Sequence, residues 1–232
     1  MRGLIIFDLD GTLYRGDAPY WHYAGAIARR LPAGQREEYL RQVRDHLEGR
    51  RRVAANDNWE AMVRLAAPYH ADAALFQEAF LETRAFMLDA DRCPLEVPQG
   101  LQAFLRAARG AVDLVLATNS PSAACFPLLD RLALRDAFDA VFPSANKPDG
   151  LAAVASARWH GPPDPRRTLS VGDHYPNDIA PAVARGWTTA YITPYGDDPG
   201  PSSVRGMTLE DVLPFLWDWV DSIAKEDDHG NS

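Results

Sequence analysis

Cysteine is scarce in this sequence of 232 residues, which contains only Cys93 and Cys125. The spacing of the two matches neither a metal-binding nor a redox pair and is typical of reduced thiols. Long apolar runs are also missing, since none approaches the roughly 20 residues of a membrane span. The apolar run at residues 4–7 is too short for a targeting signal and leads into two aspartates. These absences predict a cytoplasmic protein with no membrane partner.

Positive charge is outnumbered, because 24 Lys and Arg face 32 Asp and Glu for a formal net charge of −8. A general nucleic-acid surface needs clustered positive charge, so we expect no nucleic-acid partner. The hydrophobic fraction of 47% is ample for a core. The length suits one large α/β domain, or a core domain with a smaller insert.

The chain shows two kinds of pattern. Residues 17–93 carry apolar residues at helical spacing and no convincing strand, which predicts helices over 17–31, 35–48, 57–67 and 72–88. From residue 94 short apolar runs alternate with amphipathic segments. The expected strands after the first are 112–117, 140–142, 168–171 and 188–192. The expected helices are 99–109, 121–132, 148–159, 178–185 and 209–223.

Strands separated by helices imply right-handed parallel crossovers and a sheet covered on both faces. We therefore predict an α/β fold: a doubly wound, Rossmann-like parallel sheet, interrupted after its first strand by an all-helical insert. The predicted core spans residues 1–16 and 94–226, the helical insert spans 17–93, and a polar tail at 227–232 is expected to be disordered.

The stretch at residues 7–14 organises the chain. Asp8 and Asp10 follow the apolar run 4–6, and side chains two apart on an extended chain lie on one side. Gly11 then permits a sharp turn. Two acids held together at the end of a buried strand repel each other unless a cation lies between them. A hard divalent cation with oxygen ligands, such as Mg²⁺, meets that need.

Other polar residues follow the later strands. Ligands of doubly wound sheets bind at the carboxyl ends of the strands. The candidates at those ends are Thr118, Asn119, Lys147, Asp173 and Asp178. Each alone is also typical of a helix cap, a turn or a solvated helix start. Their occurrence in order, each after a strand, favours a site for a phosphate bound through Mg²⁺.

These residue types suit phosphoryl transfer. Asp8 can attack phosphorus and form an aspartyl-phosphate. Asp10 can give a proton to the departing alcohol and later take one from the attacking water. Lys147 and Mg²⁺ offset negative charge, while the Thr118 hydroxyl and nearby N–H groups hold phosphoryl oxygens.

The motifs together resemble those of the haloacid dehalogenase (HAD) superfamily, with a helical cap inserted after the first strand. The matching positions are residues 8–12, Thr118, the pair 147–148, and the pair 172–173 with Asp178. The resemblance implies a phosphatase-type hydrolase with Asp8 as nucleophile and Asp10 as general acid and base.

The same resemblance implies the ligands. Thr118 and Lys147 are expected to bind the substrate phosphate, and Asn119, which follows Thr118 at the strand end, is a further candidate for this role. Mg²⁺ is expected on Asp8, the Asp10 backbone carbonyl and Asp173. Asp178 is expected to bind the metal, to orient its surroundings or to hold Lys147 in place.

Several functions stay open. The best match is hydrolysis of a small-molecule phosphate monoester, and a cap that excludes large substrates favours a soluble phosphorylated metabolite. The alternatives are a phosphomutase or phosphotransferase acting on a sugar phosphate, a dehalogenase, which Asp10 disfavours, and a non-catalytic binding protein. Trp21 and His22 in the cap are candidates for substrate specificity, with ordinary helix packing as the alternative.

Overall fold

The computed structural model describes residues 2–69 and 72–230. The chain divides into two compact units. One runs up to Arg15 and resumes at Val97, and the other is Gly16–Glu96. The sequence predicts these boundaries after residues 16 and 93, so the observed ones differ by one and three residues.

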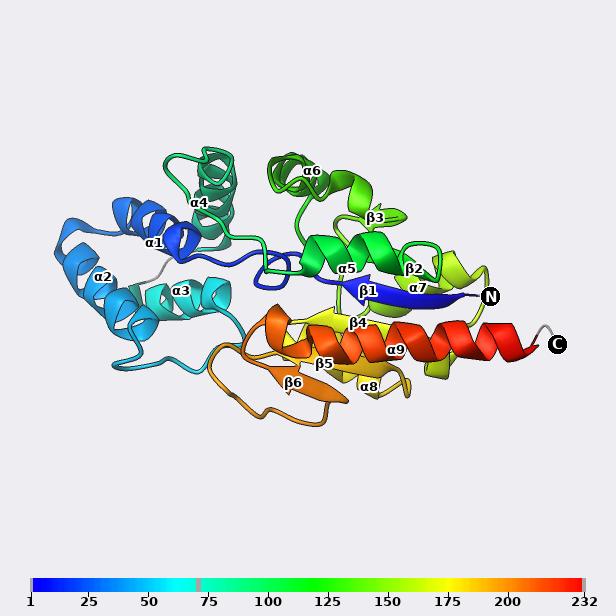
Figure 1. Ribbon diagram of the computed structural model, residues 1–232. Helices are drawn as coiled ribbons and strands as arrows, with labels where there is room; N and C mark the ends of the chain where they lie inside the picture. The colour runs from blue at the N-terminus through cyan, green and yellow to red at the C-terminus, as the bar shows by residue number, and fades with distance from the viewer. Residues whose placement is uncertain (1, 70–71, 231–232) are drawn as a thin grey trace. The chain divides into compact units, whose positions relative to one another are not determined.

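The first unit contains a six-stranded sheet within the described residues, and every strand pair is parallel. The strands are β1 (Gly3–Phe7), β2 (Val112–Ala117), β3 (Ala140–Phe142), β4 (Thr168–Gly172), β5 (Thr188–Ile192) and β6 (Val204–Gly206). Their order is β3-β2-β1-β4-β5-β6 (Figure 1). Strands β2 and β3 follow on one side of β1, and β4, β5 and β6 follow in order on its other side. The predicted doubly wound, Rossmann-like sheet is therefore confirmed.

Helices cover both faces of this sheet. Alternation along β1 sends Leu4 and Ile6 to one face, where they join a core with residues of α7 (Leu151–Trp159) and α8 (Ala180–Val183). Gly3 and Phe7 face the other way. A side chain at Gly3 would meet Trp219 of α9 (Leu209–Gly230), and the Phe7 ring packs on α5 (Leu101–Ala108). Figure 1 shows α5 and α9 together in front of the sheet. The first unit has a further helix, α6 (Ser122–Arg131), between β2 and β3.

Strand β6, a π-helical turn and the end of α9 differ from the sequence prediction. Strand β6 has three residues, too few for a recognisable alternation. A π-helical turn, Tyr175–Ile179, precedes α8 where one regular helix was expected over 178–185. The predicted end of the last helix at residue 223 and the predicted disordered tail are wrong up to Gly230, since α9 continues to that residue. The added segment is rich in Lys, Glu and Asp, and a polar composition does not by itself stop a helix. Residues 231–232 of the predicted tail lie outside the described part.

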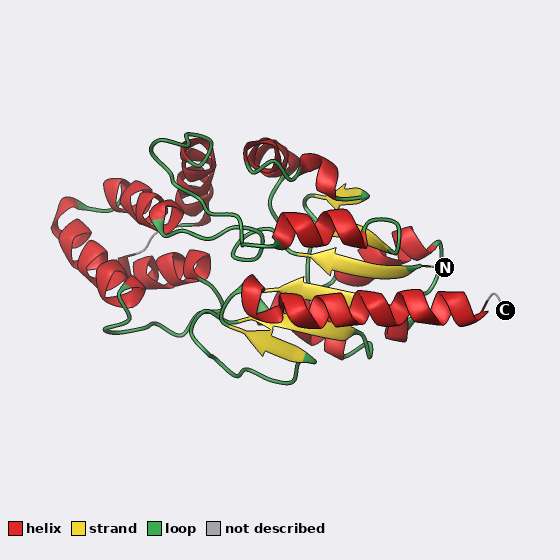
Figure 2. Cartoon of the chain, in the orientation of Figure 1, coloured by secondary structure: helices red, strands yellow, loops and turns green. Residues whose placement is uncertain are grey.

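The second unit is built from helices, as Figure 2 shows. They are α1 (Ala18–Arg30), α2 (Ala33–Leu47), α3 (Asn58–Ala66) and α4 (Ala73–Phe86). Asp57 and Asp72 cap α3 and α4 by accepting hydrogen bonds from backbone N–H groups three residues on. The unit has its own apolar core around Ile27, Tyr39 and Met62. Among the described residues of the whole chain, no helix is long and apolar enough to cross a membrane.

The apolar core of the second unit predicts that two leucines differ in their contribution to stability. Leu31 is 2% exposed and belongs to this core, whereas Leu81 on α4 is 46% exposed. We expect Leu31→Ala to lower the free energy of unfolding by about 2–5 kcal/mol through lost burial and a cavity. The matched Leu81→Ala should change it by less than about 0.5 kcal/mol. Urea unfolding followed by circular dichroism measures both, and equal losses would contradict a core at Leu31.

Candidate active site

Asp8 stands directly after β1, whose five residues are all buried. Its backbone N–H donates to the carbonyl oxygen of Val171 in β4 at 2.9 Å. The ladder between the two strands therefore continues one residue past β1 and fixes the main chain of Asp8. The residue is 8% exposed, so its carboxylate lies at the carboxyl edge of the sheet, largely removed from water.

Lys147 lies between two acids. Its Nζ donates to Oδ1 of Asp8 and to Oδ1 of Asp178, both at 2.6 Å. The residue is 7% exposed, and an ammonium buried to this degree needs such partners. The two contacts join β1, the segment after β3 and the turn after β4 at one point.

Asn119 fixes the main chain of that lysine. The backbone N–H of Lys147 donates to Asn119 Oδ1 at 2.7 Å, and Asn119 Nδ2 donates to the Lys147 carbonyl oxygen at 3.0 Å. The sequence predicts Asn119 as a phosphate ligand. The structure uses both ends of its side-chain amide on the backbone of Lys147, which makes the amide a support for the lysine.

Three carboxylates form a cluster at this edge. One oxygen each of Asp8, Asp173 and Asp178 lies within 4.8 Å of the other two. Asp178 is 1% exposed and belongs to the π-helical turn. Its Oδ2 accepts a hydrogen bond from the backbone N–H of His174 at 3.1 Å. The turn thus brings Asp178 back toward the strand end from which Asp173 projects.

Two glycines make room for the cluster. Gly11 has a φ of +78°, and a Cβ there would collide with the carboxylate of Asp173. A Cβ at Gly172 would collide with the side chain of Asp178. Both acids therefore sit against bare backbone, and Gly11 combines this close approach with a turn that disfavours any other residue.

The cluster suits a divalent cation. Its three carboxylates exceed the single ammonium of Lys147 by two negative charges when all are ionised. Carboxylate oxygens converging on one point are the ligands that Mg²⁺ prefers. Asp8, Asp173 and Asp178 are the side chains that fit it.

The side chain of Asp10 has different partners from those of the cluster. Its Oδ1 accepts a hydrogen bond from the Tyr14 hydroxyl, and its Oδ2 accepts one from Ser120 Oγ at 2.9 Å. Tyr14 and Ser120 were not predicted as site residues. The available signal was their spacing, because Ser120 stands two residues after Thr118 and Tyr14 one helical turn after Asp10.

Thr118 is oriented for donation. It is 1% exposed, and its Oγ1 accepts a hydrogen bond from the backbone N–H of Ser120 at 3.1 Å. Because that contact uses a lone pair, the hydroxyl hydrogen can be donated to another acceptor. This arrangement suits a ligand oxygen at the end of β2.

Burial and neighbouring charges shift the pKa values of Asp8 and Lys147. Burial raises the pKa of the Asp8 carboxyl to about 7, against the nearby Lys147 ammonium, which lowers it, while Asp178 and Asp10 raise it further. Burial acts to lower the pKa of Lys147, but the carboxylates of Asp178 and Asp8 outweigh burial and raise this pKa above its ordinary value. These carboxylates favour the charged form of Lys147, and burial makes Asp8 a weaker acid than an ordinary aspartate.

The two cap candidates differ in their surroundings. Trp21 is 37% exposed. The His22 ring stacks on Phe86, with centroids 4.1 Å apart and planes 10° apart. Its Nδ1 lies 3.0 Å from the hydroxyl of Thr83, which itself donates to a carbonyl oxygen. The hydroxyl therefore accepts from His22, whose Nδ1 carries a hydrogen.

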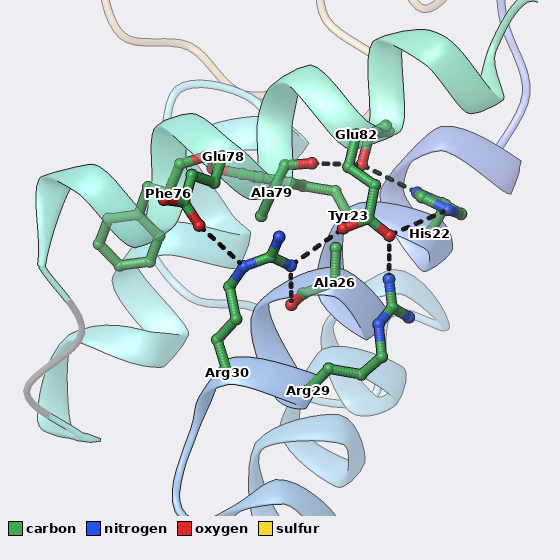
Figure 3. Close-up of polar contacts among 10 residues, drawn as sticks. His22, Tyr23, Ala26, Arg29, Arg30, Phe76, Glu78, Ala79 and Glu82 are labelled. Carbon is green, nitrogen blue, oxygen red and sulfur yellow. Dashed lines mark hydrogen bonds and ion pairs between the residues drawn. The ribbon is translucent and has the colours of Figure 1, made fainter.

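His22 also borders an ion-pair network between α1 and α4. Figure 3 shows Glu82 of α4 beside His22 and facing Arg29 and Arg30. Burial lowers the pKa of His22, and Glu82 opposes this effect. These contacts are the helix packing that the sequence leaves as the alternative for His22.

Comparison with known proteins identifies the class to which this fold and site belong. A family model of haloacid dehalogenase-like hydrolases matches residues 3–186. The chain belongs to this family of hydrolases. No curated protein matches the sequence significantly.

Solved structures share the fold at low identity. YfnB from Bacillus subtilis, a HAD hydrolase solved with magnesium, matches with a TM-score of 0.62 and 18% identity, over 93% of this chain and 99% of that one. A protein from Thermotoga maritima, assigned as a beta-phosphoglucomutase, matches with 0.63 and 18%, over 93% and 99%. A 2-haloacid dehalogenase from Pseudomonas syringae pv. Tomato DC3000 matches with 0.53 and 22%, over 94% and 100%. Proteins named as a hydrolase, a phosphomutase and a dehalogenase share this fold, so the fold alone does not identify the reaction, which has to be argued from the site.

The close approach at Gly11 predicts an effect on metal binding. Gly11→Ala should weaken Mg²⁺ binding by about tenfold or more, because the new Cβ displaces the Asp173 carboxylate. Gly34→Ala is the control, since a Cβ there meets nothing within 4 Å. Isothermal titration with Mg²⁺ measures both variants. Unchanged affinity in Gly11→Ala would exclude Asp173 as a ligand.

The raised pKa of Asp8 predicts how Mg²⁺ binding changes with pH. A proton competes with the cation for this carboxylate, so binding strengthens as pH rises through about 7. Affinity should be about tenfold higher one unit above that pKa than one unit below it. Titration at constant ionic strength measures the difference. Asp8→Asn should bind more weakly and lose most of this dependence, and a wild type with equal affinity at both values would refute the competition.

Proposed function

We propose that this protein hydrolyses a small-molecule phosphate monoester with the help of Mg²⁺, through an aspartyl-phosphate on Asp8. The observation that carries the proposal is the position of the Lys147 ammonium, 2.6 Å from Asp8 and from Asp178 beside a third carboxylate. An anionic nucleophile approaches an anionic phosphate only where cations offset the repulsion. This edge of the sheet combines a buried carboxylate with a fixed cation.

In the first half of the reaction, an oxygen of Asp8 attacks phosphorus and the bond from phosphorus to the alcohol oxygen breaks. Lys147 reduces the repulsion between the carboxylate and the phosphoryl oxygens. The Thr118 hydroxyl donates a hydrogen bond to one of those oxygens. Asp10 gives its proton to the departing alcohol oxygen, which would otherwise leave as an unstable alkoxide.

In the second half, water attacks the phosphorus of the aspartyl-phosphate. Asp10, now ionised, takes a proton from that water, and the bond between Asp8 and phosphorus breaks. Inorganic phosphate leaves, and both acids return to their starting forms. Mg²⁺ on Asp8, Asp173 and Asp178 would supply charge neutralisation for the phosphoryl group.

The proposed substrate is a small phosphorylated metabolite, and the proposed location is the cytoplasm. A helical cap inserted after β1 favours small substrates over phosphoproteins. Cysteines without metal or redox spacing suit a reducing compartment. Trp21 remains a candidate for contact with the leaving group.

The other family reactions make different demands on the site. A phosphomutase uses the same two acids but returns the phosphoryl group to a sugar hydroxyl instead of water. A dehalogenase expels a halide, which needs no proton, so the hydrogen-bonded carboxylate of Asp10 favours phosphate ester chemistry. A binding protein has no need of a buried nucleophile paired with a lysine.

The experiment is phosphate release across a panel of phosphorylated metabolites. We expect release that requires Mg²⁺, stops with chelator, and falls by at least about 10³-fold in Asp8→Asn, because the variant lacks the nucleophile. Cys93→Ser, a buried cysteine of the cap segment, serves as a folded control with near wild-type release. Phosphoryl transfer between sugars without net release would replace hydrolysis by the mutase reaction. Turnover of 2-haloacids instead would refute the proposal.

A further inference from the structure

The surroundings of Asp10 carry an inference beyond the reaction itself. Both oxygens of its carboxylate accept a hydrogen bond, one from Tyr14 and one from Ser120. Tyr14 is 2% exposed and Ser120 is 6% exposed, so both donors are held in packed surroundings. Two donors on opposite oxygens fix the plane of a carboxylate as well as its place.

We infer that Tyr14 and Ser120 are positioning residues that hold the Asp10 carboxyl group in the orientation for proton transfer to the leaving alcohol. The inference rests on the proposed function, in which Asp10 is the general acid and base. Neither hydroxyl contacts the phosphorus, and neither gains or loses a proton during the reaction. Each acts through Asp10.

Hydroxyl groups suit this task because the acid has to change its charge. A hydroxyl both donates and accepts, and each carboxyl oxygen has two lone pairs. Asp10 can therefore carry its transferable proton on one lone pair while the other keeps the contact with Tyr14 or Ser120. An ammonium, which only donates, would tie the group to its charged form.

Ser120 further links the acid to the phosphate-binding strand end. Its backbone N–H donates to Thr118 Oγ1, while its side chain donates to Asp10. The backbone N–H of Ser144 donates to the Ser120 carbonyl oxygen at 2.9 Å, which secures the residue to the segment after β3. One short stretch thus sets the distance between the acid and the place where the phosphate is bound.

The step that depends on this orientation is the departure of the alcohol. The bond from Asp8 to phosphorus forms, the phosphorus–oxygen bond of the ester breaks, and the Asp10 proton moves to the oxygen that leaves. A poor leaving group needs that proton during the step, and a good one departs as an anion. Misplacement of Asp10 therefore slows esters of basic alcohols selectively.

The experiment compares phenyl phosphate with p-nitrophenyl phosphate, which are similar in shape but differ in leaving-group basicity. The quantity is kcat/KM, because it reports steps only up to departure of the alcohol. We expect Tyr14→Phe and Ser120→Ala each to lower kcat/KM for phenyl phosphate by about tenfold or more. For p-nitrophenyl phosphate the same variants should lose less than about threefold. Equal losses on both esters would overturn the inference, since a general packing defect does not distinguish leaving groups.

A double-mutant cycle tests whether the hydroxyls act through the acid. In an Asp10→Ala background, Tyr14→Phe should cause no further loss on phenyl phosphate. A full additional loss would show that Tyr14 acts elsewhere and would overturn its assignment. Tyr39→Phe is the matched control, because it removes a buried tyrosine hydroxyl that donates to a carbonyl oxygen of the cap at 3.2 Å. It should leave the ratio of the two esters unchanged.

Cleavage of the two esters by the wild type shows whether the inference or the proposed function has failed. If it cleaves both esters and Asp8→Asn does not, the proposed function stands and the variants decide the inference. If it cleaves neither, the crystal structures of Tyr14→Phe and Ser120→Ala decide it, since Asp10 should then adopt more than one rotamer. A single unchanged rotamer in both structures would overturn it.

Discussion

The contacts of the Lys147 ammonium with Asp8 and Asp178 are the interaction on which the site depends. Three strand ends contribute to it, and all three side chains are buried. Removing one partner from such a pair leaves a buried charge uncompensated, typically at about 3–5 kcal/mol. The lysine therefore has its own support, since Asn119 binds both polar groups of its backbone. The position of the Asp8 carboxylate thus follows from the end of β1 and from this one cation.

The doubly wound sheet explains why residues so distant in sequence meet. Strands β1 and β4 are neighbours although much of the chain lies between them, and their register is fixed from Leu4 to Phe7. Parallel strands end at the same edge, so Asp8 and Asp173 project from adjacent ends. The close approach of the acids then requires missing side chains at Gly11 and Gly172. Rigid buried strands provide the position, and the glycines provide the space.

The sequence predicted the elements that have a regular apolar pattern and the polar residues that follow the strands. A short, nearly continuous apolar run predicted β2, and helical spacing predicted the helices of the second unit. The order of polar residues after the strands pointed to Lys147 and the acids. Features set by local hydrogen bonding were not accessible. Strand β6 is too short for periodicity, and the π-helical turn at Tyr175 depends on where Asp178 finds its partners. Asn119 was a candidate because of its place at the end of β2, but its amide contacts the backbone of Lys147, which only the folded chain brings near.

The two acids of the first motif show how surroundings separate chemical roles. Asp8 contacts the Lys147 ammonium, which can only donate hydrogen bonds. The Asp8 oxygen in this contact therefore has to act as an acceptor. In the proposed reaction Asp8 is the nucleophile and has to be ionised, and the Lys147 ammonium favours that form against the opposing effect of burial. Asp10, two residues away, contacts two hydroxyls, which tolerate both the charged and the neutral carboxyl. In the proposed reaction Asp10 gives and regains a proton in each cycle, which needs that tolerance. Under the proposed function, the lysine beside Asp8 and the hydroxyls beside Asp10 would give two identical side chains different tasks, the same principle by which paired carboxylates divide acid and nucleophile roles in other enzymes.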